Sequence, residues 1–131
     1  MVYGDTNSTL AGALAAAKMH IPVAHVEAGL RSFNTAMPEE INRILTDRIS
    51  SWLFPPTAAA SAHLRREDVP QAQIKEVGDV MYDVARHHGD RVNAQGRVLA
   101  QLGLAPTAYV LATVHRAENT NVERRLLAIV D

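Results

Sequence analysis

The 131-residue chain contains no cysteine, so it holds neither a disulfide framework nor a metal site built from thiolates. It also lacks any apolar stretch near the ~18 residues that indicate a membrane-spanning helix. Its first residues show no charged segment followed by an apolar core, which is the pattern of a secretory signal. These absences predict a cytoplasmic protein that has no membrane as a partner.

Sequence motifs for cofactors and metals are missing too. The chain has no G-x-G-x-x-G fingerprint, no P-loop and no His-Glu-x-x-His or comparable metal spacing. We therefore predict no metal site and no cofactor. Charge is nearly balanced, with 13 Lys plus Arg against 14 Asp plus Glu. Since nonspecific nucleic-acid binding needs a strong basic field, nucleic acid is not an expected partner.

Short apolar segments alternate with segments of helical periodicity along the whole chain. The pattern predicts strands at 2–3, 22–26, 52–54, 74–77 and 109–114, and helices at 7–19, 38–51, 58–66, 80–102 and from 122 onward. Gly89 and Gly96 interrupt the fourth helical segment, and Gly103 is its expected stop. Alternation of this kind predicts an α/β fold with a parallel, Rossmann-like sheet.

One helix has a particularly clear apolar face. In the segment 38–51 and just after it, five residues are spaced to pack against a sheet: Ile41, Ile44, Leu45, Ile49 and Trp52. Both ends of the sequence cut through elements, because the first strand has only two or three residues and the last helix stops with its apolar face just presented. We expect a segment from the middle of a larger, two-domain protein, truncated at both ends.

Three apolar runs end on ionisable groups, at Asp5, at Glu27 and at His115-Arg116. In open parallel sheets ligands bind beyond the carboxyl ends of the strands, so these tips predict one crevice that carries the chemistry. Asp5 stands at a strand-to-helix turn, where a carboxylate can also simply cap the helix. Glu27 ends a mostly apolar strand and precedes Ala28-Gly29, where the backbone can approach a ligand closely.

The helix that begins at Pro38 carries further candidates. Glu39 and Glu40 lie in its first turn, where acids offset the helix dipole, and Glu39 to Arg43 is the favoured spacing of an ion pair within a helix. Both acids thus have a structural explanation beside a functional one. The His115-Arg116 pair suits phosphate oxygens, although a histidine at a strand tip is also often just hydrogen-bonded.

Four segments together carry a resemblance to a known family. They are Gly-Asp-Thr at 4–6, His-Val-Glu-Ala-Gly-Leu-Arg at 25–31, Pro-Glu-Glu-Ile-Asn-Arg at 38–43 and Thr-Val-His-Arg-Ala-Glu-Asn at 113–119. In this order and at about this spacing they resemble the non-hydrolysing UDP-N-acetylglucosamine 2-epimerases. The similarity extends over essentially the whole chain, with Ala117 standing where the family commonly has a second arginine.

The resemblance implies two Rossmann-like domains of the GT-B type with the active site between them. It places residues 1–80 in the amino-terminal domain, 81–105 in the hinge helices and 106–131 at the start of the carboxy-terminal domain. It also implies that UDP-N-acetylglucosamine and UDP-N-acetylmannosamine are interconverted by elimination of UDP to a 2-acetamidoglucal and re-addition. A homodimer and a place in cell-surface polysaccharide biosynthesis are further implications.

The same resemblance assigns roles to individual residues. The catalytic residues it implies are Asp5, Glu27, Glu39 and His115. It implies that Arg43 contacts substrate phosphate and that Arg116 belongs to the substrate-binding or regulatory region. Three alternatives stay open at this point: a hydrolysing 2-epimerase, a GT-B glycosyltransferase, and an inactive nucleotide-sugar-binding module.

Overall fold

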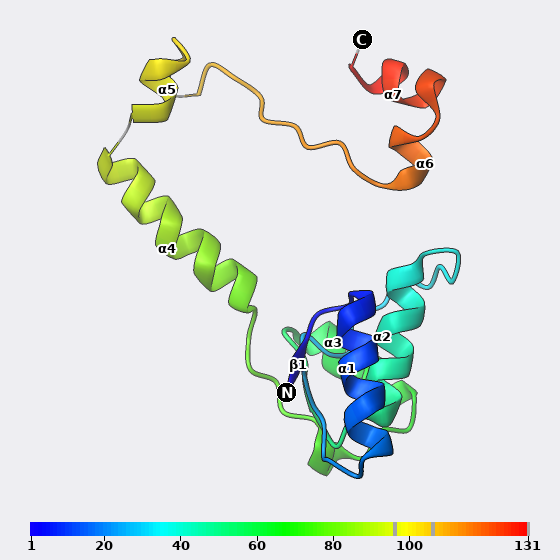
Figure 1. Cartoon of the computed structure of the whole chain (residues 1–131). Coiled ribbons are helices and arrows are strands. Elements are labelled where there is room, and N and C mark those ends of the chain that lie inside the picture. Colours follow the sequence, from blue (N-terminus) through cyan, green and yellow to red (C-terminus); the bar gives the residue numbers. More distant parts are fainter. Residues whose placement is uncertain (96, 106, 131) are drawn as a thin grey trace. The chain divides into compact units, whose positions relative to one another are not determined.

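The structure is a computed structural model of the chain and describes residues 1–95, 97–105 and 107–130. It consists of two compact units, Met1–His87 and His88–Asp131. In the first unit the elements are β1 (Val2–Tyr3), α1 (Asn7–Lys18), β2 (Ala24–Val26), α2 (Pro38–Ile49), β3 (Trp52–Phe54), α3 (Ala58–Arg66) and the short 3₁₀ helix η1 (Gln71–Gln73) (Figure 1). The predicted alternation of strands and helices is confirmed for this unit.

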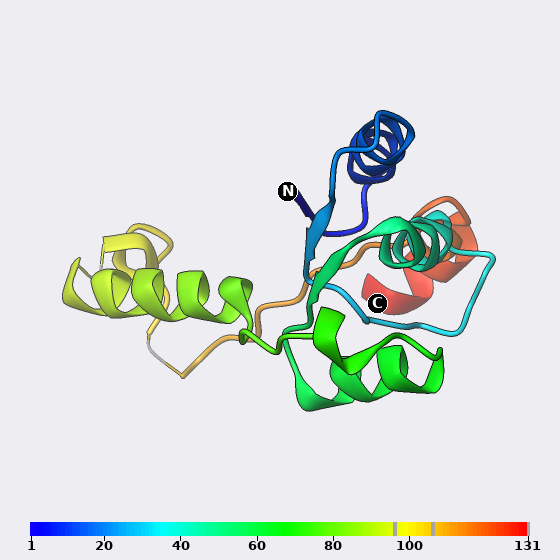
Figure 2. The same ribbon diagram turned by 90° about the horizontal axis from the view of Figure 1, so that it is seen from below.

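The three strands form one parallel sheet in the order β1-β2-β3. His25 of β2 stands opposite Val2 of β1 and Leu53 of β3, so these three side chains share one face of the sheet. Helices α1, α2 and α3 all lie on the same side of the strands (Figure 2). Right-handed connections that all run in one direction along the sheet place the helices there. Because the strands are parallel, their carboxyl ends lie at one edge of the sheet.

The strand predicted at 74–77 is present only as a short pairing. Ile74 forms a single parallel bridge to Leu53, and the backbone N–H groups of Lys75 and Val77 donate to the carbonyls of Leu53 and Pro55 at 2.9 and 3.1 Å. The segment thus runs beside β3 as predicted. It extends the sheet at the edge opposite β1 and directs the following Asp79 toward the strand tips.

The apolar face predicted for α2 is wrong. Ile41, Ile44 and Leu45 are exposed, as is Trp52 in β3. The buried residues of α2 are instead polar: Glu40, Asn42, Thr46 and Asp47. Burial of Glu40, Asn42 and Asp47 is tolerable because each has a hydrogen-bond partner in another segment. The small apolar cluster lies elsewhere, among Ala28, Leu53, Leu64 and Ile74.

Gly29 joins β2 to this cluster at a position that only glycine fits. Its φ is +78°, and a Cβ on Gly29 would lie 2.5 Å from the backbone oxygen of Ala60 and 2.9 Å from Leu64. We expect Gly29→Ala to lower the free energy of unfolding by about 3 kcal/mol, through backbone strain plus overpacking. Urea unfolding followed by the fluorescence of Trp52, the one tryptophan of the chain, measures this loss.

The control for this prediction is Gly78→Ala. Gly78 has a similar φ of +88° but nothing within 4 Å of an added Cβ, so it should lose only the conformational part, about 1 kcal/mol. Equal losses for the two variants would show that the contact of Gly29 with α3 is not tight.

The described residues of the second unit form helices joined by segments without regular secondary structure. Helix α4 (Val80–Gln95) leads into it, followed by α5 (Arg97–Gln101), α6 (Ala117–Thr120) and α7 (Glu123–Val130). Gly89 lies inside α4 without ending it, whereas Gly103 follows α5 at a φ of +66°, the expected stop. Gly96 lies outside the described residues. The helix predicted from 122 onward is confirmed as α7, and α6 was not predicted.

The strand predicted at 109–114 is wrong. This segment has no regular secondary structure, and the side chains of Val110 and Leu111 are 93% and 83% exposed. A strand needs a neighbour to accept and donate its ladder hydrogen bonds, and none of the described residues of this unit forms one. The apolar sequence pattern alone therefore does not produce a strand here.

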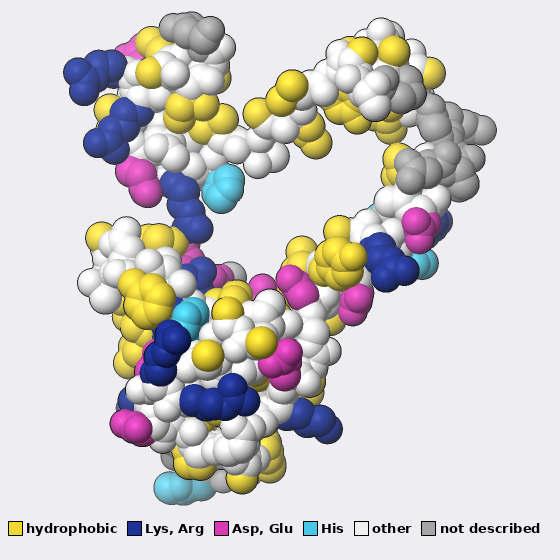
Figure 3. Space-filling model, turned by 180° about the vertical axis from the view of Figure 1, so that it is seen from behind, with side chains coloured by type: hydrophobic (Ala, Val, Ile, Leu, Met, Phe, Trp, Pro, Cys, Tyr) yellow, Lys and Arg dark blue, Asp and Glu magenta, His cyan; other side chains and the backbone are white. Residues whose placement is uncertain are grey.

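Two of the predicted absences can be compared with the described residues. None of the described helices is long and apolar enough to cross a membrane, and the described residues contain no cluster of three or more potential metal ligands. Over the face drawn in Figure 3, positive and negative side chains are interspersed among apolar and neutral ones.

Candidate active site

The tips of β1 and β2 bring two acids together. Asp5 follows Gly4 at the end of β1, and Glu27 follows β2 directly. Glu27 Oε2 would lie 3.3 Å from a Cβ built on Gly4, so the Glu27 carboxylate contacts the turn that carries Asp5. Burial raises the pKa of Glu27, and the negative charges of Asp5 and Asp79 raise it further. The acids at these strand tips therefore share one electrostatic environment, as the sequence predicted.

Glu39 joins this site from α2. A hollow of about 640 Å³ lies where the amino-terminal ends of α1 and α2 meet, and its lining is Asp5, Thr6, Asn7, Ser8, Pro38, Glu39 and Asn42. Its volume is in the usual range of ligand pockets. Two of the predicted catalytic acids, Asp5 and Glu39, therefore line one pocket. Glu27 is not among the residues that line it, but contacts the turn that carries Asp5.

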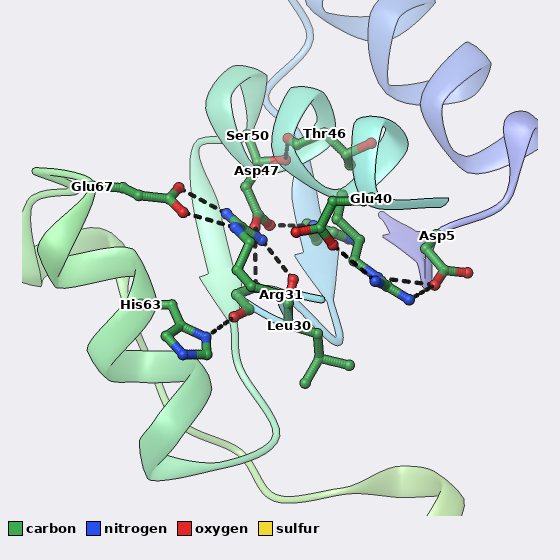
Figure 4. Close-up of polar contacts among 12 residues, drawn as sticks. Asp5, Leu30, Arg31, Glu40, Thr46, Asp47, Ser50, His63 and Glu67 are labelled. Carbon is green, nitrogen blue, oxygen red and sulfur yellow. Dashed lines mark hydrogen bonds and ion pairs between the residues drawn. The ribbon is translucent and has the colours of Figure 1, made fainter. Parts of the chain in front are cut away.

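Arg43 connects the acids of the site. Its Nη2 and Nε donate to Asp5 Oδ2 at 2.6 and 3.0 Å, and its Nη1 donates to Glu40 Oε2 at 3.0 Å (Figure 4). Burial of the guanidinium lowers its pKa, but the hydrogen bonds that it donates to Asp5 and Glu40 outweigh burial, and the pKa of Arg43 is raised. Arg43 is thus a fixed cation within the site.

Two purely structural roles that the sequence suggested, for Asp5 and for Glu39, are wrong. Thr6, not Asp5, caps α1, since the Thr6 hydroxyl accepts from the Thr9 N–H. Among the described residues Arg43 forms its ion pairs with Asp5 and Glu40 rather than with Glu39. Asp5 and Glu39 are therefore not explained by helix capping or by an ion pair within the helix.

Glu40 has a structural role that its place in the first helical turn did not predict. Its two carboxylate oxygens accept hydrogen bonds from the backbone N–H groups of Ser32 and Phe33, both at 2.9 Å. Burial raises the pKa of Glu40, but these bonds and the one from Arg43 outweigh it, so the pKa is lowered. Glu40 holds the loop between β2 and α2 in place and leaves its neighbour Glu39 to face the pocket.

A buried polar network behind the strand tips was missed in the sequence. His25 Nδ1 lies 2.7 Å from Asp47 Oδ1, and Asp47 Oδ2 accepts from the Gly29 N–H at 3.0 Å and pairs with Arg31 at 2.8 Å. Arg31 then donates two bonds of 2.7 Å to Glu67 (Figure 4). The one available signal was an ionisable histidine in an otherwise apolar strand, because such a group needs a buried partner.

Asp79 was also not predicted as a site residue. It follows the segment at 74–77, and its charge is one of those that raise the pKa values of Glu27 and Tyr3. Its Oδ1 accepts from the N–H groups of Met81 and Tyr82 at 2.8 and 3.2 Å, at the start of α4. The end of the segment that runs beside β3 thus adds negative charge to the environment of Glu27.

His115 and Arg116 lie in the second unit, immediately before α6. The His115 carbonyl accepts from the side-chain amide of Asn119 at 3.2 Å, and the Arg116 carbonyl accepts from the Thr120 hydroxyl at 3.0 Å. Arg116 has a φ of +84°. The structure thus brings Asp5, Glu27 and Glu39 together, and the convergence of His115 and Arg116 with them stays a prediction.

The coupling between Asp5 and Glu27 leads to a titration experiment. In Asp5→Asn we expect the pKa of Glu27 to fall, because a negative charge is lost and the Arg43 cation loses its main anionic partner nearby. Carboxyl ¹³C NMR of Glu27 across the pH range measures the shift. The control is Asp68→Asn, an exposed site whose φ of +61° suits asparagine; an equal shift there would refute the coupling.

Comparison with known proteins now identifies the family. A profile described as UDP-N-acetylglucosamine 2-epimerase matches residues 1–131. The chain belongs to this family. It is 54% identical over 133 residues to the UDP-2,3-diacetamido-2,3-dideoxy-D-glucuronate 2-epimerase of Pseudomonas aeruginosa, with all of the chain and 36% of that protein covered. It is 47% identical over 133 residues to the UDP-N-acetylglucosamine 2-epimerase of Methanocaldococcus jannaschii, with the same coverage.

A solved structure gives the same result. The crystal structure of the Methanocaldococcus jannaschii UDP-GlcNAc 2-epimerase in complex with UDP-GlcNAc and UDP matches with a TM-score of 0.86 at 49% identity. It covers 98% of this chain, and the chain covers 36% of it. The 2-epimerase family segment therefore spans about a third of the length of the relatives it matches, and its α/β, Rossmann-like fold agrees with theirs.

Proposed function

We propose that the complete protein containing this segment is a non-hydrolysing 2-epimerase that interconverts UDP-N-acetylglucosamine and UDP-N-acetylmannosamine. The observation that carries the proposal is the convergence of Asp5 and Glu39 on one pocket, with Glu27 beside them, in a chain of the 2-epimerase family. The pocket lining includes two carboxylates, those of Asp5 and Glu39, which suits a sugar ring that develops positive charge during reaction.

The chemistry of the sugar explains why several acids are needed. The C2 proton of an N-acetylhexosamine is not adjacent to a carbonyl, so its direct removal would leave a poorly stabilised anion. If the C1–O bond breaks first, UDP leaves with the bonding electrons and C1 becomes oxocarbenium-like. Loss of the C2 proton to a base then gives a 2-acetamidoglucal. UDP adds back to C1 while an acid protonates C2 from the other face, which inverts that carbon.

The described residues suit these steps. Glu27 has a raised pKa, so it exchanges protons nearer neutral pH than an ordinary carboxyl group, as a general acid or base requires. Asp5 pairs with Arg43 at 2.6 Å and offers its carboxylate to an oxocarbenium-like centre. Glu39 approaches the same pocket from α2 and is the second candidate for proton transfer. In this proposal His115 and Arg43 bind the departing diphosphate.

A second substrate is favoured by one comparison. The relative from Pseudomonas aeruginosa, 54% identical, acts on a UDP-2,3-diacetamido-2,3-dideoxy-D-glucuronate. That sugar has the same nucleotide and the same 2-acetamido group, so the elimination and re-addition steps apply to it without change. It differs at C3 and C6, where it carries an acetamido group and a carboxylate. The family chemistry thus supports either UDP-sugar as the substrate.

Several broader features are proposals of the same kind. We propose a GT-B arrangement with domain limits at 1–80, 81–105 and 106–131, and a homodimeric complete enzyme. We also propose a substrate-binding or regulatory role for Arg116, and a cytoplasmic place in cell-surface polysaccharide biosynthesis. Support for these features comes from the family to which the chain belongs.

The experiment that tests the proposed function is a product assay with the complete protein. Each UDP-sugar is supplied alone, and ¹H NMR follows the anomeric and C2 signals and any released UDP. We expect conversion of at least one of them into its C2 epimer with UDP still attached. Stoichiometric release of UDP with free sugar would establish the hydrolysing alternative, and no conversion of either substrate would refute the proposal.

A further inference from the structure

His25 lies within the buried network and does not line the pocket. Its ring is completely buried, Nδ1 lies 2.7 Å from Asp47 Oδ1, and Nε2 lies 2.8 Å from the Gly4 carbonyl oxygen. A carbonyl oxygen only accepts hydrogen bonds, so Nε2 donates to Gly4. Asp47 also accepts from the Gly29 N–H and pairs with Arg31, so on this geometry Nδ1 donates to the Asp47 carboxylate.

The Gly4 carbonyl belongs to the peptide that leads into Asp5. The Gly4 N–H donates to the Val26 carbonyl at 3.1 Å, and the Gly4 carbonyl accepts from His25 at 2.8 Å. The first bond continues the ladder between β1 and β2, whereas the second comes from a side chain beneath it. Glu27 follows His25 by two residues, and its own N–H donates to the Phe54 carbonyl at 3.0 Å. His25 is thus a side-chain connection between the turns that carry the two acids.

The orientation of the imidazole is itself fixed. Asp47 Oδ1 accepts from the ring, while Asp47 Oδ2 is held by the Gly29 N–H and by Arg31. Arg31 is held in turn by Glu67, and its side chain is 1% exposed. Since Asp47 is held from the loop after β2, and Arg31 of that loop by Glu67 after α3, the ring cannot turn without breaking its own two buried bonds.

We propose that His25 is a positioning residue, which fixes the Asp5 turn against the Glu27 tip by donating from Nε2 to the Gly4 carbonyl. This inference rests on the proposed epimerase function and adds a residue to it. Without the bond, the Gly4 carbonyl loses its side-chain partner, and Asp5, still held by Asn42 and Arg43 from α2, shifts relative to Glu27. Misplacement of a reacting group by about 1 Å can cost ~10²-fold in rate, so His25 acts on turnover through Asp5 without touching the substrate.

Two substitutions separate the two bonds of the ring. The amide nitrogen of glutamine falls near Nε2, so His25→Gln keeps the donor to Gly4 and loses the donor to Asp47. The amide nitrogen of asparagine falls near Nδ1, so His25→Asn keeps the donor to Asp47 and loses the donor to Gly4. The matched control is Ser50→Ala, which removes one buried hydrogen bond to the Thr46 carbonyl at the far end of α2.

The closing experiment measures kcat and KM of these variants in the complete protein. We expect kcat to fall about 10- to 100-fold in His25→Asn, with KM changed much less, as for other residues that orient a catalytic group. His25→Gln should retain most of the turnover, and Ser50→Ala should match the wild type. Equal losses in the Gln and Asn variants, or full turnover in His25→Asn, would overturn the proposal.

Two NMR measurements separate this inference from the proposed function and from poor folding. In the unsubstituted protein at pH 7, ring ¹⁵N spectra should show a proton on Nε2 of His25, and an Nε2 without a proton would overturn the inference. The Asp5 carboxyl ¹³C signal should move in His25→Asn and stay close to the wild-type position in His25→Gln. If neither UDP-sugar reacts, these spectra still decide the role of His25, whereas the epimerase proposal fails by itself.

Discussion

Glu27→Gln in the complete protein should lower kcat for epimerisation on the order of 10²-fold or more. Glutamine has the same shape as the acid but cannot take up or release a proton, and the raised pKa of Glu27 reflects an environment that already favours its uncharged form. The fold should therefore be kept. Steady-state kinetics measure the effect, and kcat and kcat/KM should fall together because the lost interaction belongs to the transition state.

The matched control for this variant is Glu76→Gln. Glu76 also lies in the first unit, where its carboxylate accepts from the Ser61 hydroxyl at 2.8 Å, and it is not among the charges that shift the pKa of Glu27. It should turn over at the wild-type rate. A near-normal rate for Glu27→Gln would remove Glu27 from the catalytic residues, and an equal loss in both variants would point to a general effect on folding.

Asp47→Ala should cost the most stability of any single substitution in the network. Asp47 is 3% exposed, pairs with the buried Arg31 guanidinium and contacts the buried His25 ring. Its removal leaves the buried Arg31 cation and the buried His25 ring without their shared partner, and breaking a buried ion pair costs about 3–5 kcal/mol. This is a large part of the ~5–15 kcal/mol that stabilises an ordinary domain. Urea unfolding of the chain, followed by Trp52 fluorescence, measures the change.

Glu67→Ala provides the comparison. Glu67 pairs with the same Arg31, but its side chain is 31% exposed, so water replaces much of what is lost and the cost should be about 1 kcal/mol or less. Arg31 also keeps Asp47 in this variant. If Asp47→Ala were no more destabilising than Glu67→Ala, the buried network would not be what stabilises the strand tips.

The parts of the fold that follow from local pattern were predictable. The alternation from β1 to α3, the start of α2 at Pro38 and the stop at Gly103 each depend on neighbouring residues in the sequence. The strand expected at 109–114 depends on a partner strand, which its own residues cannot specify. Ile41 and Leu45 were predicted to be buried but are exposed. The side of α2 that is buried depends on the partners of Glu40 and Asp47, which lie in distant segments of the sequence.

The candidate site divides in the same way. Asp5 and Glu27 were predictable because parallel strands end at one edge of a sheet, and Glu39 because its motif resembles that of the family. The pair His25 and Asp47 joins residues 22 positions apart, and no spacing rule indicates such a contact. The sequence carried only the weaker signal of an ionisable group within an apolar strand.

The most direct measurement of the account is epimerisation by the complete protein in deuterated water. Elimination of UDP and re-addition require the C2 proton to leave and a solvent-exchanged one to return, through acids such as Glu27 and Glu39. We predict that each molecule of epimerised UDP-sugar carries one deuterium at C2, seen by mass spectrometry and by loss of the C2 ¹H signal. An epimerised product without deuterium at C2 would contradict the proposed chemistry of these acids.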